Sequence, residues 1–173
     1  MRPVRKKHRL EESLYSQPGA YFITVCVKDR RPLLSTVVGA EDHFGPQIQL
    51  TEIGAVVQKY TQSIPGIGHY VIMPNHVHMI LHISAKEPHG GPMWSSAPTK
   101  DAGVGPMWSS APTDANILSL VRTWKTLITK ELGQSIWQRS SYDHVIRSEQ
   151  EYVEIAEYIM GNPGKWAEDK YFC

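Results

Sequence analysis

The 173-residue sequence is short of cysteine, of net charge and of long apolar runs. Its two cysteines, Cys26 and Cys173, provide neither a disulfide framework nor the spacing of a cysteine metal site. We therefore expect a protein of a reducing compartment, and the cytoplasm fits best. The formal net charge is only +1, so the overall charge does not identify a partner and basic residues have to be weighed by position.

The absence of long apolar runs also limits the class of protein. No stretch approaches the ~20 apolar residues that cross a bilayer, and the N-terminus lacks the apolar segment of a signal peptide. We expect no membrane role. At this length, one domain spanning residues 1–173 is the default expectation.

Two segments depart from the ordinary composition. Residues 1–16 read as a basic N-terminal arm, in which Arg5, Lys6 and Lys7 are candidate phosphate contacts, although a solvated tail explains the same composition. Residues 84–114 contain the sequence GPMWSSAPT twice, in a setting rich in glycine, proline and serine. Because two copies are too few for a solenoid, we interpret them as a flexible duplicated insertion within the domain.

Elsewhere, strand and helix patterns alternate. Residues 20–28 alternate as a strand does, and residues 47–50 read as a second, short strand. Helical spacing follows from residue 51, with Thr51 as a candidate N-cap. The remaining expected elements are two strands separated by Pro74 and Asn75, an amphipathic helix over 116–132, a strand at 145–147, and a helix that opens with Ser148 and Glu151 and stops at Pro163.

Three histidines interrupt the hydrophobic run NHVHMILHI. On a strand, His76, His78 and His82 share one face, while the core face is formed by the intervening residues Val77, Met79, Leu81 and Ile83. Imidazoles two residues apart stand ~7 Å from each other along a strand, close enough to converge on one metal ion. Two such histidines alone are weak evidence, and a polar, exposed sheet face is the alternative.

The last helix brings a tyrosine and an asparagine to one side. Tyr158 and Asn162 are one turn apart, at the edge of an apolar stripe that we expect to comprise Val153, Ala156, Ile159 and Met160. If this helix lies near the histidines, a nucleophile, an amide oxygen and two imidazoles meet in one place. Considered alone, Tyr158 fits an interfacial aromatic residue and Asn162 a C-terminal cap.

Taken together, the motifs resemble a known family. MPNHVHMIL, followed by YDHVIRSEQEYVEIAEYIMGNPGKW, is similar to the REP-associated tyrosine transposases, which belong to the single-tyrosine HUH transposases of insertion sequence 200 type. AYFITVCVKDRRPLL resembles the first strand of that family and its turn. The similarity covers nearly the whole chain, but the duplicated insertion departs from the compact family pattern.

This resemblance implies an α+β fold, a ferredoxin-like domain with a central antiparallel sheet of about five strands and helices packed on it. It implies that His76, His78 and Asn162 bind a divalent metal ion, Mg²⁺ or Mn²⁺, and that Tyr158 is the nucleophile. The implied function is cleavage and rejoining of single-stranded DNA beside hairpins through a covalent 5′-phosphotyrosine, without ATP. His82 has no assigned role and is expected to be a sheet-face residue.

Several alternatives stay open. Arg30, Arg31, Arg122 and Lys125 are candidate phosphate contacts, but each also fits a solvated surface residue. A histidine-triad nucleotide hydrolase would need a further histidine where Ile80 stands. A domesticated protein that binds hairpin DNA without turnover is the more serious rival, and both a monomer and a homodimer are compatible with the sequence.

Overall fold

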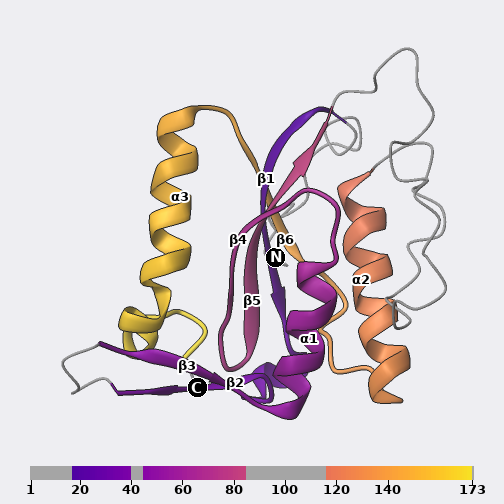
Figure 1. Cartoon of the computed structure of the whole chain (residues 1–173), viewed down its shortest axis with the longest axis vertical. Coiled ribbons are helices and arrows are strands. Elements are labelled where there is room, and N and C mark those ends of the chain that lie inside the picture. Colours follow the sequence, from indigo (N-terminus) through magenta and orange to yellow (C-terminus); the bar gives the residue numbers. More distant parts are fainter. Residues whose placement is uncertain (1–16, 40–44, 85–115, 173) are drawn as a thin grey trace, which may run out of the picture.

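The computed structural model describes residues 17–39, 45–84 and 116–172. A four-stranded antiparallel sheet lies between α3 on one side and α1 and α2 on the other (Figure 1). The N-terminal arm, with Arg5, Lys6 and Lys7, the repeats of the insertion, and Cys173 fall outside the described residues. Among the described residues, no helix is long and apolar enough to cross a membrane.

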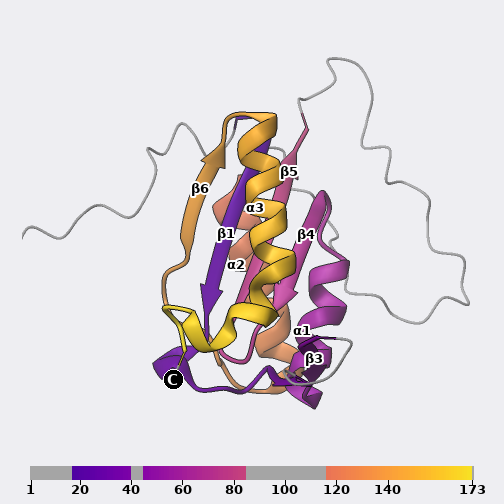
Figure 2. The same cartoon turned by 90° about the vertical axis from the view of Figure 1, so that its left-hand side faces the viewer.

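The sheet has the strand order β4-β5-β1-β6, and all neighbouring strands are antiparallel (Figure 2). The strands are β1 (Gly19–Cys26), β4 (Ile67–Ile72), β5 (His76–Ile83) and β6 (Tyr142–Ile146). With α1 (Glu52–Gln62) after the first strand and α2 (Ile117–Leu132) after the third, this is the ferredoxin-like arrangement, and the α+β class is confirmed. The short strands β2 (Ser35–Val38) and β3 (Gln47–Leu50) pair separately, so the central sheet has four strands.

The main hydrophobic core lies between the sheet and the pair α1 and α2. The alternation predicted for β1 and β5 is confirmed, because Ile23, Val25, Val77 and Met79 are fully buried on this side. The predicted stripe of α2 is buried as well, with Trp124 at its centre. The predicted N-cap of α1 is confirmed, because the Thr51 side chain accepts a hydrogen bond from Gly54 N. In α2, the side chain of Asn116 caps the helix by accepting from Leu118 N.

The opposite face of the sheet carries α3 (Glu149–Gly161), and here the predicted stripe was partly wrong. Ala156 and Ile159 are buried, but Val153 and Met160 are 48% and 61% exposed. In place of Val153 and Met160, Tyr152 and Ile155 pack beside Ala156 and Ile159 against the sheet. Each residue turns a helix by about 100°. Because the stripe was assigned one residue too far along the helix, two of its four predicted members lie on the solvent side.

The two ends of α3 also differ in detail from the prediction. Ser148 caps the helix by accepting from Glu151 N, as expected, but Glu151 reaches back to Arg147 N and His144. The helix ends at Gly161, and the chain continues through Pro163 as a 3₁₀ turn, η3 (Asn162–Glu168). Upstream, β6 begins at Tyr142, three residues before the predicted strand.

Gly54 provides a test of how closely α1 packs against the backbone at Leu34. A Cβ atom built at this position would lie 1.9 Å from the carbonyl oxygen of Leu34, which also accepts hydrogen bonds from Thr51. We predict that Gly54→Ala destabilises the fold by about 3 kcal/mol, the upper part of the usual range for overpacking. At Gly161, by contrast, nothing lies within 4 Å of such a Cβ, so Gly161→Ala should be neutral or stabilising by up to ~1 kcal/mol. Thermal unfolding of both variants measures the difference, and equal melting temperatures would contradict the packing described.

Candidate active site

His76 and His78 lie on the α3 side of β5, where pairing with β1 fixes their positions. His76 is opposite Cys26 and His78 is opposite Thr24 in the antiparallel register. Both imidazoles are at most 1% exposed. His82, further along the same face, is exposed and lies 3.4 Å from the Tyr152 hydroxyl, in keeping with its prediction as a sheet-face residue.

The two imidazoles turn the same ring nitrogen toward each other. His76 Nε2 and His78 Nε2 are 3.0 Å apart, while His76 Nδ1 lies 2.9 Å from Asn75 Oδ1 and His78 Nδ1 lies 2.8 Å from Thr24 Oγ1. The Asn75 amide is oriented by its own nitrogen, which donates to the carbonyl oxygens of Arg30 and Tyr171. Its oxygen therefore accepts from His76 Nδ1, and the lone pair of His76 is left on Nε2. Such outer contacts are typical of histidines that bind metals.

Tyr158 reaches this pair from α3. Its hydroxyl lies 3.3 Å from His78 Nε2, and its ring meets Phe22 of β1 edge to face. The side chain is 42% exposed, so one edge of the ring faces solvent. The structure thus brings together the predicted nucleophile and the predicted histidines, 80 residues apart in the sequence.

Asn162, one turn beyond Tyr158, is 2% exposed. Its Oδ1 atom is buried and has no hydrogen-bond partner among the described residues. A buried acceptor without a donor is costly, and a cation would satisfy it. The carboxylate of Asp169, just beyond η3, lies within 4.8 Å of the ring nitrogens of His76 and His78. The two imidazole nitrogens and the carboxylate fit a divalent cation such as Mg²⁺ or Mn²⁺, and Asn162 lines the same cavity as His78 and Asp169.

The electrostatics of the site favour neutral imidazoles and a protonated tyrosine. Burial lowers the pKa of His76 to about 4, against the opposing charge of Asp169, and it also holds the pKa of His78 well below its ordinary value. Burial, with a smaller contribution from Asp169, raises the pKa of Tyr158, while a hydrogen bond from Asn162 opposes this rise. The imidazoles are thus ready to act as ligands, but Tyr158 has to be activated before it can act as a nucleophile.

A cavity of about 460 Å³ opens beside these residues. Its walls include His78, Tyr158 and Asn162, with Phe22 and Tyr142 on the sheet side. The C-terminal segment supplies the rest of the wall: Lys165, Glu168, Asp169 and Lys170. His76 is covered from another direction by the ring of Tyr171, 4.6 Å away, so the histidine pair is reached from the side of His78.

The predicted phosphate contacts lie in two other places. Arg30 donates to the carbonyl oxygen of Lys170 and lies over the Tyr171 ring, so it contacts the C-terminal segment, and Arg31 is exposed nearby. Arg122 and Lys125 line a second cavity beside α2.

The sequence reasoning missed Asn75, Thr24 and Asp169. Of these, only Asn75 was noted in the sequence, where it was interpreted as part of a turn between two strands.

Comparisons with known proteins identify a relative of this chain and a solved structure with a similar fold. No known protein-family model matches the chain. An uncharacterized protein of Haemophilus influenzae is 32% identical over 184 residues, which cover 97% of this chain and 93% of the relative. The chain belongs to the same family as this protein.

A solved structure, described as a REP-associated tyrosine transposase bound to a REP hairpin, has a TM-score of 0.53 with this chain. The two are 22% identical, and the match covers 95% of this chain and 74% of the other. The similarity to REP-associated tyrosine transposases that the motifs indicated is thereby confirmed in the fold.

Metal binding tests the cluster directly. We predict that His76→Ala and His78→Ala each weaken Mn²⁺ binding by more than about 100-fold, and that Asn75→Ala, which removes an outer contact, weakens it by ~10–100-fold. His82→Ala is the matched control, because it removes an imidazole from the same strand face and should leave the affinity unchanged. The spectroscopic signal of free Mn²⁺ measures each affinity, and an equal loss in the control would contradict the assignment.

The candidate oxygen ligands, Asp169 and Asn162, are tested in the same titration. Asp169→Asn keeps the size of the side chain and removes its charge, while Asn162→Ala removes the buried carboxamide. Since the imidazoles and the amide are neutral, we predict that loss of the single negative charge weakens binding more than loss of the amide. The opposite ranking would mark Asn162 as the main oxygen ligand.

Proposed function

We propose that this protein is a metal-dependent single-strand DNA transesterase that cleaves and rejoins DNA beside hairpins. The observation that carries the proposal is the approach of Tyr158 to His78, at 3.3 Å, beside a second buried imidazole and an amide oxygen without a partner. The similarity in fold to a transposase whose structure holds a REP hairpin supports DNA as the substrate. Tyr158 is the proposed nucleophile, and His76, His78, Asn162 and Asp169 are the proposed ligand groups.

In the proposed reaction, the Tyr158 oxygen attacks the phosphorus of a backbone phosphodiester. The new bond joins phosphorus to the tyrosine oxygen, the bond to the 3′ oxygen breaks, and the leaving 3′ oxygen takes up a proton as the tyrosine loses one. The product is a 5′-phosphotyrosine, in which the energy of the original phosphodiester is retained. A second 3′-hydroxyl can then reverse the step and rejoin a strand, so ATP is not required.

The ligand groups would supply the charge stabilisation that this step needs. A divalent ion held by these groups would neutralise developing charge on the phosphate and would lower the pKa of a nearby hydroxyl. Thr24 and Asn75 hold the imidazole rings in place from outside, and Phe22 supports the ring of Tyr158. Because burial raises the pKa of Tyr158, we expect little reaction without metal.

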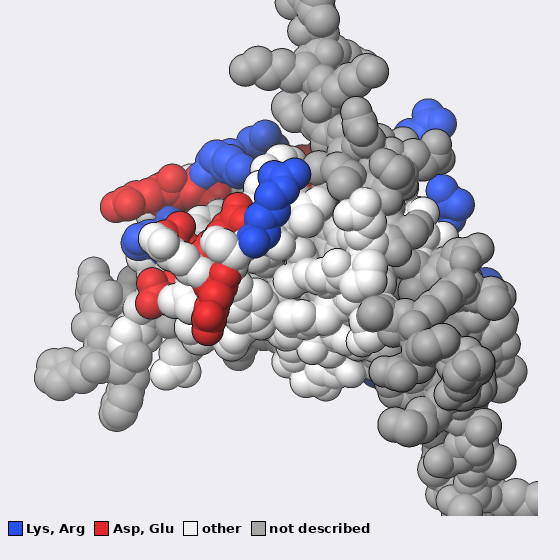
Figure 3. All heavy atoms as spheres, turned by 90° about the horizontal axis from the view of Figure 1, so that it is seen from above, with Lys and Arg blue, Asp and Glu red and all other residues white. Residues whose placement is uncertain are grey.

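The charges on α3 restrict how the strand approaches. Glu149, Glu154 and Glu157 are exposed on this helix. On the side of the molecule where α3 lies, Figure 3 shows acidic side chains with basic side chains next to them. The three exposed carboxylates of α3 repel phosphates locally. Lys165 and Lys170 line the cavity at the other end of the helix. We therefore propose that the strand enters along the C-terminal segment and β6 and does not cross the outer face of α3.

Covalent trapping tests the nucleophile against a matched tyrosine. Tyr142 lines the same cavity and is exposed to the same extent as Tyr158, 42%. With Mn²⁺ and a labelled hairpin oligonucleotide drawn from the DNA beside its own gene, we predict a denaturation-resistant adduct for the natural protein and for Tyr142→Phe. Tyr158→Phe or chelation of the metal should abolish it.

Two results would contradict the proposal. Hairpin binding without any adduct, across both metals and several hairpins, would favour a domesticated DNA-binding protein. An adduct that survives Tyr158→Phe but is lost in Tyr142→Phe would move the nucleophile to β6. Size-exclusion mass measurement on the same samples distinguishes a monomer from a homodimer.

A further inference from the structure

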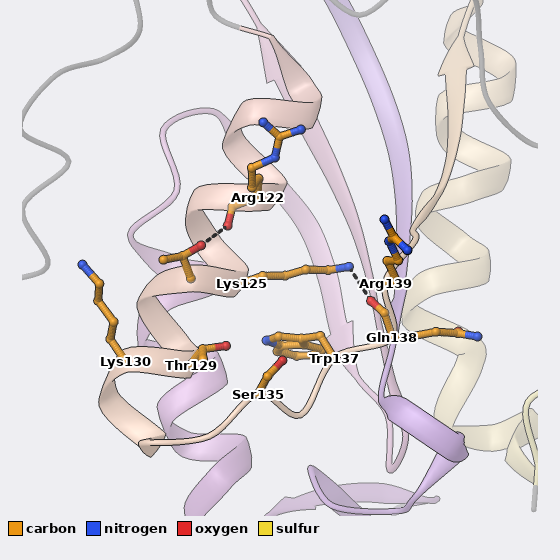
Figure 4. A pocket seen from close by; sticks show the side chains of 9 residues that line it. Arg122, Lys125, Thr129, Lys130, Ser135, Trp137, Gln138 and Arg139 are labelled. Atoms are coloured by element: carbon orange, nitrogen blue, oxygen red, sulfur yellow. Dashed lines mark hydrogen bonds between the residues drawn. The ribbon is translucent and has the colours of Figure 1, made fainter.

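A second cavity, of about 280 Å³, lies between α2 and the segment that leads into β6 (Figure 4). It shares no lining residue with the cavity of Tyr158. Four basic side chains line it, three from α2 and one from the facing segment, and no carboxylate among the described residues does. We call this cavity the basic pocket; its cations are Arg122, Lys125, Lys130 and Arg139.

The floor of the basic pocket carries a polar group that lacks a partner. Trp137 is 6% exposed, and its Nε1 atom is buried with no acceptor among the described residues. A backbone bridge to Val27 positions this residue, and the ring of Trp124, 4.7 Å away, packs against the indole. Figure 4 shows its nitrogen pointing toward the side of the pocket where Thr129 and Ser135 lie. An indole nitrogen can only donate, so the pocket needs an acceptor here.

Lys125 is the innermost of the four cations. Its ammonium donates to the carbonyl oxygens of Gln138 and Ser140, at 2.9 and 3.3 Å, which ties α2 to the segment before β6. Burial lowers its pKa to about 8, and a nearby anion would favour its charged form again. None of the four cations forms an ion pair with a carboxylate of the described residues, so their charges are not neutralised within this part of the chain.

We propose that the basic pocket binds a backbone phosphate of the DNA strand on which Tyr158 acts. A phosphodiester supplies the oxygen acceptors that Trp137 Nε1 lacks and the negative charge that the cations lack. Arg122, Lys130 and Arg139 are exposed around the cavity, so the positive charge extends over its rim. An extended polyanion fits such an open site better than an enclosed small ligand does.

The position of the pocket relative to the first cavity supports one continuous strand. Gln138 lines the basic pocket and Tyr142 lines the cavity of Tyr158, four residues further on. A fully extended chain covers at most ~14 Å over that distance, a span that a few nucleotides of one strand can bridge. The identity of the bound strand rests on the proposed function. The assignment of the basic pocket as an anion site rests on the geometry of the pocket alone.

Fluorescence anisotropy with a labelled hairpin that carries a single-stranded extension tests the pocket. Arg139→Gln and Arg122→Gln remove exposed charges without touching the core, and Arg147→Gln, at the far end of β6, is the matched control. We expect each pocket variant to weaken binding by at least about fivefold and to lower the salt-dependence slope by up to about 0.7, the value for one phosphate contact on a single strand. The control should change neither quantity. Equal losses in all three variants would overturn the proposal.

The indole signal of Trp137 gives a second readout that does not depend on any variant. In nitrogen-edited NMR spectra, the Trp137 Nε1–H signal should shift when the oligonucleotide is added, while that of Trp124, which donates to Thr61 Oγ1 at 3.2 Å, should not. A response to inorganic phosphate with none to the oligonucleotide would mark a site for small anions and overturn the assignment to DNA. Two different results distinguish this proposal from the proposed function. If no adduct forms at saturating DNA, the chemistry proposed at Tyr158 is contradicted. If the Arg122 and Arg139 variants bind DNA with unchanged affinity, the role proposed for the basic pocket is contradicted.

Discussion

The register between β1 and β5 is the constraint on which the site depends. It places His78 opposite Thr24 and His76 opposite Cys26, and it buries Val77, Met79 and Leu81 against the two-helix side of the sheet. A slip by one residue would exchange these faces, so the imidazoles would enter the apolar core and the apolar side chains would leave it. The hydrophobic effect that forms the core therefore also sets the direction in which the histidines point.

The same strand face anchors the helix that carries Tyr158. Ile80 stands between His78 and His82 on this face and packs with Ile146, Ala156 and Ile159. This cluster is much smaller than the core on the other side of the sheet. A few buried aliphatic contacts next to Tyr158 thus fix the distance between its hydroxyl and His78. Packing thus holds Tyr158 near the buried imidazoles, while one edge of its ring stays exposed.

Periodicity predicted those parts of the site that lie within one element. The alternation of NHVHMILHI assigned the histidines to one face, and the spacing of Tyr158 and Asn162 put them one turn apart, because both depend on local geometry alone. The stripe of α3 was placed one residue off, since Val153 and Met160 look apolar but face solvent. Asp169 was missed because the chain returns to the histidines only after η3, and no local pattern encodes that return. Asn75 was assigned to the turn, although its amide also orients His76.

In the basic pocket, too, the residues that lie on one helix were predicted from the sequence and the others were not. Arg122 and Lys125 were predicted as phosphate contacts from their positions on an amphipathic helix. Trp137 and Arg139 lie on the segment before β6, and only the tertiary fold brings them to face α2. The resemblance to a family contributed what periodicity could not, namely that the helix of Tyr158 packs near the histidines. The described geometry agrees with that placement, since the hydroxyl of Tyr158 lies 3.3 Å from His78 Nε2.

Two tyrosines contact the histidine pair. Identifying which tyrosine becomes attached to DNA is therefore the most direct test of the proposed chemistry. The ring of Tyr171 lies 4.6 Å from that of His76, and burial raises its pKa to about 12, whereas Tyr158 has an exposed edge in the cavity. The measurement is mass spectrometry of the peptides released from the protein after reaction with the hairpin oligonucleotide and Mn²⁺. A nucleotide attached to Tyr158 alone is the expected result. A nucleotide on Tyr171 or Tyr142, with Tyr158 unmodified, would contradict the proposed chemistry.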